Sequence, residues 1–91
     1  MNLCDYNTIR DLLARHGFHF SKSMGQNFLI DTHVLEKIID AAGIGKDDMV
    51  LEIGPGIGTM TQYLAEAARK VVAVEIDKNL IPILHETLQG Y

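Results

Sequence analysis

The chain has 91 residues, a formal net charge of −4 and a single cysteine, Cys4. One cysteine excludes an internal disulfide framework and disfavours a zinc site, so we expect a protein of the reducing cytoplasm without a bound metal. No apolar run approaches the ~20 residues that a membrane-spanning helix needs, and no secretory signal is visible, so no membrane partner is expected. Residues 1–30 carry a net charge of +1 and residues 31–91 a net charge of −5, unlike a strongly basic nucleic-acid-binding domain.

The first third of the chain predicts one helix followed by a loop. The stretch "NTIRDLLARHG" has apolar residues at helical spacing, with Asn7 or Thr8 as its cap and Gly17 at its end. The next stretch, "FHFSKSMGQNFLI", shows no period and gathers glycine, serine and asparagine, which is typical of a loop. His16 and His19 have a spacing that can hold a metal on a helix, but Gly17 interrupts that helix and no third ligand is near.

The remaining residues alternate between helices and strands. The predicted elements are a helix over 31–43, a strand over 47–53, a helix over 59–68, a strand over 70–76 and a helix over 77–88 capped by Asp77 or Asn79. Both strands are nearly continuous apolar runs, which favours burial on both faces. This order predicts an α/β fold with a parallel sheet and right-handed crossovers.

Three glycines follow the first predicted strand in "LEIGPGIGTMTQYL" and lead directly into a helix. In such a unit the first glycine, Gly54, permits a tight turn, while Gly56 and Gly58 let a ligand approach the backbone at the helix N-terminus. Glu75 ends the second strand, 21 residues beyond Gly54, where a carboxylate accepts hydrogen bonds from ribose hydroxyls. The sequence therefore predicts a site for a ligand that contains a nucleoside.

The acidic residue inside the first strand indicates which nucleoside-containing ligand the predicted site binds. Glu52 lies two residues before the turn, where a carboxylate repels a pyrophosphate but suits a cation. The G-x-G-x-G spacing also differs from the G-x-G-x-x-G of dinucleotide sites. S-adenosylmethionine, which carries an ammonium and a sulfonium but no phosphate, is the favoured cofactor. The alternatives are a nicotinamide or flavin cofactor, or a structural turn whose glycines only allow close packing while Glu52 bonds to the backbone.

A second unusual stretch is "KSMGQNFLID". From the residues alone, it is a connection in which Phe28 and Leu29 pack against the next helix, capped by Asp31. However, a G-Q-N-F-L segment, followed by E-I-G-P-G-x-G and then V-E-I-D, resembles the ribosomal RNA adenine N6,N6-dimethyltransferases over about residues 22–88. The residues of the G-Q-N-F-L and G-P-G segments resemble the small-subunit branch more closely than the related Erm methylases, which act on large-subunit rRNA.

The resemblance implies a truncated, Rossmann-like class I methyltransferase fold. It makes residues 31–91 the first βαβα portion of a single incomplete S-adenosylmethionine-binding domain, preceded by an N-terminal helix and a cofactor- or RNA-facing loop in residues 1–30. The implied cofactor-binding residues are Gln26, Asn27, Leu29, Glu52, Gly54, Gly56, Glu75 and Ile76. Among these, Glu52 would lie near the methionine ammonium, Glu75 would hold the ribose and Ile76 would border the adenine.

The implied function is dimethylation, at N6, of two adjacent adenosines near the 3′ end of 16S small-subunit rRNA during ribosome biogenesis. The family activates the weakly nucleophilic amine with an N-[IL]-P-[YF] motif after the fourth strand. Here the stretch "NLIP", from Asn79 to Pro82, differs from this motif because it has an extra residue before the proline and no aromatic residue after it. It also follows the second strand rather than the fourth, so it is interpreted as a helix start. The chain therefore resembles the first third of a longer enzyme. We assign it no catalytic residue, and we expect it to be inactive alone and able to self-associate through exposed strand edges.

Two alternatives to this function stay open at the level of the sequence. One is an Erm-type methylase of large-subunit rRNA, and the other is a nucleotide-binding module without catalysis. The alternatives differ in cofactor preference and in the sequence that would follow Tyr91.

Overall fold

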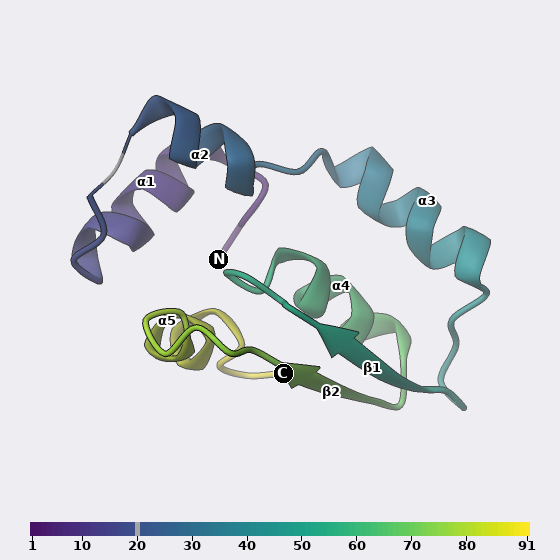
Figure 1. The fold of residues 1–91 in the computed structure, drawn as a ribbon. Helices are drawn as coiled ribbons and strands as arrows, with labels where there is room; N and C mark the ends of the chain where they lie inside the picture. The colour runs from purple at the N-terminus through teal and green to yellow at the C-terminus, as the bar shows by residue number, and fades with distance from the viewer. Residues whose placement is uncertain (20) are drawn as a thin grey trace.

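The computed structural model describes residues 1–19 and 21–91, which form helices packed on one side of a small parallel sheet (Figure 1). The elements are α1 (Tyr6–Arg15), α2 (Lys22–Phe28), α3 (Thr32–Ala42), β1 (Met49–Ile53), α4 (Thr59–Ala67), β2 (Lys70–Val74) and α5 (Ile81–Thr87). The two strands pair in parallel and α4 connects them, so the predicted α/β fold is confirmed.

The sheet buries only one of its faces in the described part of the chain. Val71 lines a hollow with residues of α4, and Ala73 lines another with residues of α5, so both helices lie on the same side of β2. On the opposite face the side chains of Leu51 and Ile53 are 65% and 72% exposed, and Val74 is 45% exposed. The predicted burial of both faces is therefore wrong for this chain, because the described helices cover only one face.

A cluster of buried apolar residues lies at the end of the sheet where the glycine turn is, rather than under the middle of the sheet. It joins residues of α1, the turn and α5, with the ring of Phe28 from α2 packed against it. Its fully packed members are Leu3, Ile9, Leu12, Leu13, Ile57, Leu80 and Ile83. Burial of this apolar surface holds the two N-terminal helices against the turn.

The helix ends agree with the sequence at α3 and differ at α1 and α5. Asp31 caps α3 by accepting a hydrogen bond from the His33 amide, and Gly43 ends it in the left-handed conformation. Helix α1 begins earlier than predicted because its cap is Asp5, which lies two residues before Asn7 and three before Thr8. Neither predicted residue caps α5; Asp77 instead accepts a hydrogen bond from the Asn79 amide and closes the preceding turn.

The predicted loop over residues 18–30 contains a helix, α2, and this prediction was wrong. The Ser21 hydroxyl oxygen caps the helix by accepting a hydrogen bond from the Met24 amide at 3.1 Å. Met24 and Phe28, four residues apart, both pack against the apolar cluster. Seven residues are too few to show a period, and tertiary packing rather than local propensity forms the helix. Position 20, which that prediction included, lies outside the described residues.

None of the described helices is both long enough and apolar enough to cross a membrane.

Candidate functional site at the glycine turn

The glycine turn lies at the carboxyl end of the parallel strands, the edge at which open α/β sheets bind their ligands. The Gly54 amide donates to the Val74 carbonyl at 2.8 Å, which extends the strand pairing by one residue into the turn. Gly54, Gly56 and Gly58 all have positive φ angles, between 62° and 94°. The chain then enters α4 at once, so backbone amides of the turn and the helix N-terminus lie together.

Gly58 has a structural reason to be glycine. Its φ is +94°, and a Cβ atom there would lie 2.8 Å from the Thr87 hydroxyl oxygen and 3.2 Å from a methyl carbon of Leu84. Both residues belong to α5, so this glycine lets α5 pack closely on the start of α4. The alternative interpretation of the glycines as packing residues therefore holds for Gly58, whereas a Cβ on Gly54 would meet nothing within 4 Å.

Glu75 contacts the turn directly. One carboxylate oxygen accepts a hydrogen bond from the Gly56 amide at 3.1 Å, and the other accepts one from the Asp77 amide at 3.0 Å. The strand β2 ends at Val74, so Glu75 is the first residue beyond it and its half-buried side chain turns across the sheet edge towards β1. A negative charge therefore lies against the backbone of the turn.

Glu52 occupies the half-buried face of β1 and is held by α4. Its carboxylate accepts a hydrogen bond from the hydroxyl of Thr61, a buried residue in the first turn of α4. The bond is to a side chain, not to the backbone as in the structural alternative. Sequence reasoning missed Thr61, although a hydroxyl three residues after the last glycine of the turn was the available signal.

The N-terminal segment reaches the turn through Phe28. Its ring carbon Cε1 lies 3.7 Å from the position that a Cβ of Gly56 would occupy. Gln26 and Asn27 are exposed on the same helix, and Leu29, which follows it, is 39% exposed. The structure thus brings α2, Gly56 and Glu75 together. Phe28 was expected only to pack against the next helix, so its contact with Gly56 was missed.

Ile76 projects away from the protein. Its side chain is 93% exposed, directly after Glu75 at the mouth of the turn. Such exposure is unusual for a large apolar residue and leaves its surface available to a ligand or another segment.

The two histidines considered for a metal do not form a metal cluster. His16 is 2.9 Å from a carboxylate oxygen of Glu86 through its Nε2 atom, and the described residues contain no group of three or more His, Cys, Asp or Glu side chains placed to hold a metal. The Asn79–Pro82 stretch forms a turn and the first residues of α5, with Pro82 in the first turn of the helix, which agrees with its interpretation as a helix start.

The sequence of the chain is similar to known proteins of one family. Residues 17–91 match the family model of the ribosomal RNA adenine dimethylases. A protein named ribosomal RNA small subunit methyltransferase A, from Lachnoclostridium phytofermentans, is 73% identical over 82 residues, which cover 89% of this chain and 28% of that protein. Its namesake from Streptococcus sanguinis is 55% identical over the whole chain and 31% of its own length.

A solved structure is similar as well. The crystal structure of a dimethyladenosine transferase from Plasmodium falciparum superposes with a TM-score of 0.60 at 40% identity, covering 67% of this chain and 23% of the other. The chain spans about 30% of the length of the curated relatives it matches. The resemblance drawn from the G-Q-N-F-L, E-I-G-P-G-x-G and V-E-I-D segments is confirmed: the chain belongs to the ribosomal RNA adenine dimethylase family.

Proposed function

We propose that this chain carries the S-adenosylmethionine-binding part of an enzyme that dimethylates N6 of two adjacent adenosines in small-subunit rRNA. Residues 31–91 form the incomplete cofactor domain, and residues 1–30 supply a helix and a segment that close over the cofactor. Family membership and the names of the relatives support the class of reaction. The proposed ribosomal substrate belongs to the whole protein, since the chain spans about 30% of its relatives.

The observation that carries the cofactor proposal is the contact between Glu75 and Gly56. Each oxygen of the Glu75 carboxylate accepts a backbone hydrogen bond at the edge of the turn, so the group is held where two ribose hydroxyls would donate to it. A carboxylate in contact with the turn also opposes a pyrophosphate there. These two features fit adenosine without phosphate better than a dinucleotide.

Glu52 and Gly54 complete the proposed site on the methionine side. The Thr61 hydroxyl fixes the Glu52 carboxylate, which would face the ammonium group of the cofactor. No atom would crowd a Cβ at Gly54, so the backbone there is open to a ligand. A half-buried carboxylate needs a positive partner or several donors, and a bound ammonium meets that need.

The N-terminal segment and Ile76 would form the remaining walls. Phe28 holds the end of α2 against Gly56, and its neighbours in the chain, Gln26, Asn27 and Leu29, would face the ligand from this helix. Ile76, exposed beside Glu75, would border the adenine ring. The cofactor supplies an electrophilic methyl group when bound, and these residues orient it and exclude water.

Calorimetric titration of the purified chain with S-adenosylmethionine and, separately, with NAD tests this proposal. We expect S-adenosylmethionine to bind and Glu75→Gln to weaken it about tenfold, because the amide offers one acceptor oxygen instead of two. Glu36→Gln, on the exposed surface of α3, is the matched control and should bind like the wild type. A preference for NAD, or equal affinities of the two variants, would overturn the assignment.

A further inference from the structure

A second hollow lies beside the proposed cofactor site. It has a volume of about 420 Å³ and runs between the C-terminal end of α1 and the turn that joins β2 to α5. Its polar lining comes from His16 and His19 on one side and from Lys78 and Asn79 on the other, with Pro82 at the base of α5. No residue proposed for the cofactor belongs to this lining.

Three of these side chains have free hydrogen-bonding groups. The ammonium of Lys78, the amide of Asn79 and the ring of His19 make no hydrogen bond or ion pair with any other residue in the described part of the chain. An ammonium and an amide NH₂ are donors that suit an oxyanion, and the imidazole adds a third. The hollow is thus lined by hydrogen-bond donors that have no acceptor in the described part of the chain.

Two acidic groups lie beside the hollow, and one of them, Glu86, is paired with a cation. Glu86 binds both Arg15, through two hydrogen bonds of 2.7 and 2.8 Å, and His16, at 2.9 Å. Asp77 accepts from the Asn79 amide at 2.9 Å on the turn itself. Because Arg15 compensates the charge of Glu86, that carboxylate opposes an anion at Lys78 less than an isolated charge would, whereas Asp77 keeps its negative charge.

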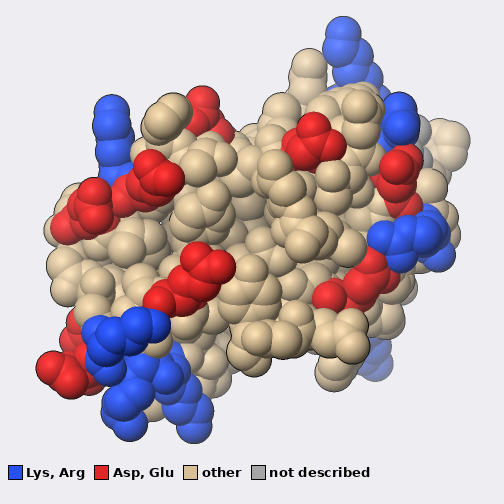
Figure 2. Space-filling model, turned by 180° about the vertical axis from the view of Figure 1, so that it is seen from behind, with Lys and Arg blue, Asp and Glu red and all other residues tan. Residues whose placement is uncertain are grey.

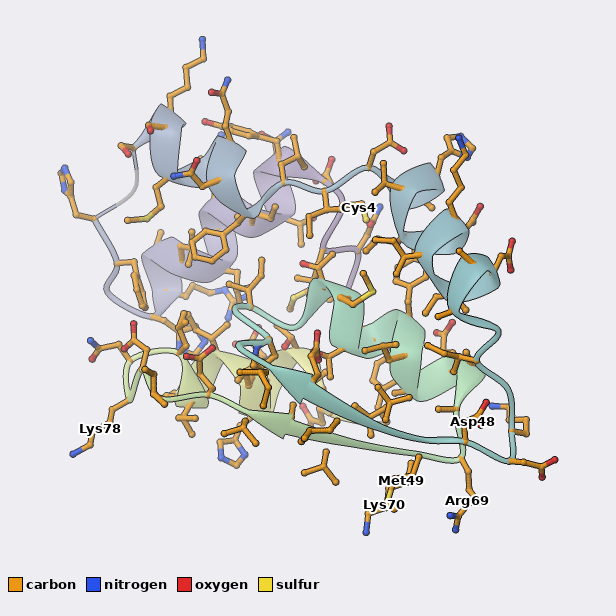
Figure 3. The ribbon with its side chains drawn as sticks, turned by 45° about the vertical axis from the view of Figure 1, so that its right-hand side comes forward. Cys4, Asp48, Met49, Arg69, Lys70 and Lys78 are labelled. Carbon is orange, nitrogen blue, oxygen red and sulfur yellow. The ribbon has the colours of Figure 1, made fainter. Side chains whose placement is uncertain are left out.

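The position of the hollow relates it to the cofactor. Lys78 is three residues beyond Glu75, and Figure 3 shows it at the opposite end of the sheet from Asp48, Met49, Arg69 and Lys70. Arg69 and Lys70, two exposed cations that are adjacent in sequence, therefore lie far from the glycine turn. On the face seen in Figure 2, Lys and Arg form separate groups divided by acidic and uncharged residues rather than one continuous basic surface.

We infer that this hollow binds a backbone phosphate of the RNA substrate and so sets the position of the strand relative to the cofactor. The inference rests on the proposed function. A chain of net charge −4 repels RNA overall, so contacts must be made at local groups of donors. Phosphate contacts fix the register of a nucleic acid without reading its sequence, and donors beside the cofactor edge suit that purpose.

The test is the salt dependence of RNA binding, measured by fluorescence anisotropy of a short labelled single-stranded RNA with the purified chain. Lys78→Ala should weaken binding about fivefold at low salt and reduce the slope of log K against log salt by about 0.7, the value for one lost contact to a single strand. Lys37→Ala, an exposed lysine on α3, is the matched control and should change neither quantity.

Two further readouts separate the possible failures. Amide NMR spectra should show the signals of Lys78, Asn79 and His19 shifting with RNA, and much less with the same concentration of inorganic phosphate. The affinity of Lys78→Ala for S-adenosylmethionine should equal that of the wild type. If the cofactor binds but RNA does not, or if both lysine variants behave alike, the phosphate site is wrong; if the cofactor itself does not bind, the proposed function fails.

Discussion

The ring of Phe28, at the end of α2, lies against Gly56 in the middle of the glycine turn, with 3.7 Å between its Cε1 atom and the place where a Cβ would be. The amide of the same glycine donates a hydrogen bond to Glu75. One residue of the turn thus contacts both the N-terminal segment and the acid after β2. This contact links two stretches that lie far apart in the sequence, and it explains how α2 reaches the proposed cofactor site.

Phe28→Ala should separate α2 from the turn. We expect a loss of about 2 kcal/mol of unfolding free energy, below the 3–5 kcal/mol of a fully buried phenylalanine because this side chain is only half-buried. The affinity for S-adenosylmethionine should fall more than stability alone explains, since α2 loses its fixed position. Urea unfolding and calorimetry measure the two effects. Phe28→Leu, which retains most of the packing, is the control, and equal cofactor affinity in all three proteins would contradict this account.

Gly58→Ala should destabilise the fold through two separate terms. The positive φ costs about 1 kcal/mol for a non-glycine residue, and the contact with Thr87 and Leu84 adds about 2 kcal/mol of overpacking. Gly43→Ala is the matched control, because its φ of +65° is also positive but a Cβ there meets nothing within 4 Å. Thermal unfolding of both variants measures the difference. If they lose equal stability, α5 does not pack on Gly58 as closely as described.

The sequence predicted the elements with strong local signals. Helix α3 has an aspartate at its start and a left-handed glycine at its end, and both act within a few residues of chain. The order of the strands and the glycine turn were also predicted, because their sequence signals likewise lie within short stretches of the chain. Helix α2 was missed because its stability comes from Met24 and Phe28 packing on residues distant in sequence. No spacing rule contains that information.

The site was predicted in part by the same logic. Glu75 and Gly56 do meet, as the distance in sequence between strand ends indicates. The partner of Glu52 was not foreseen, because a strand residue and a residue on the following helix meet only once the crossover has folded. Burial of both sheet faces was also predicted from the apolar strands, although a continuous apolar run does not specify which segment covers each face.

The open face of the sheet should make the chain self-associate. Leu51 is 65% exposed on β1 and lies beside the exposed Val72 of β2, so apolar side chains of two strands meet water together. Leu51→Lys should reduce concentration-dependent association in analytical ultracentrifugation while changing stability by less than about 0.5 kcal/mol. Val50→Lys, one residue away on the half-buried face, should instead destabilise the fold. Equal association of wild type and Leu51→Lys would show that another surface causes it.

Glu86 should make the attachment of α1 to α5 depend on pH. Two hydrogen bonds from Arg15, and then one from His16, lower the pKa of its carboxyl from 4.5 to about 2. A carboxyl whose pKa is lower in the folded state stabilises the protein above its unfolded pKa. That stabilisation is lost as the pH falls through the window from about 4.5 to about 2. Because 27% of the side chain is exposed and solvent screens the pair, we expect a contribution of about 1 kcal/mol rather than the full value of the shift.

Glu86→Gln removes the titrating group and tests this dependence. Its unfolding free energy should lie about 1 kcal/mol below that of the wild type at neutral pH, and the two should converge as the wild-type carboxyl becomes protonated in acid. Glu36→Gln, at an exposed position on α3, controls for the loss of one charge. Denaturant unfolding at a series of pH values measures the convergence. A constant difference between wild type and Glu86→Gln at every pH would mean that Glu86 stabilises by packing, and that the ion pair with Arg15 contributes nothing to holding α1 in place.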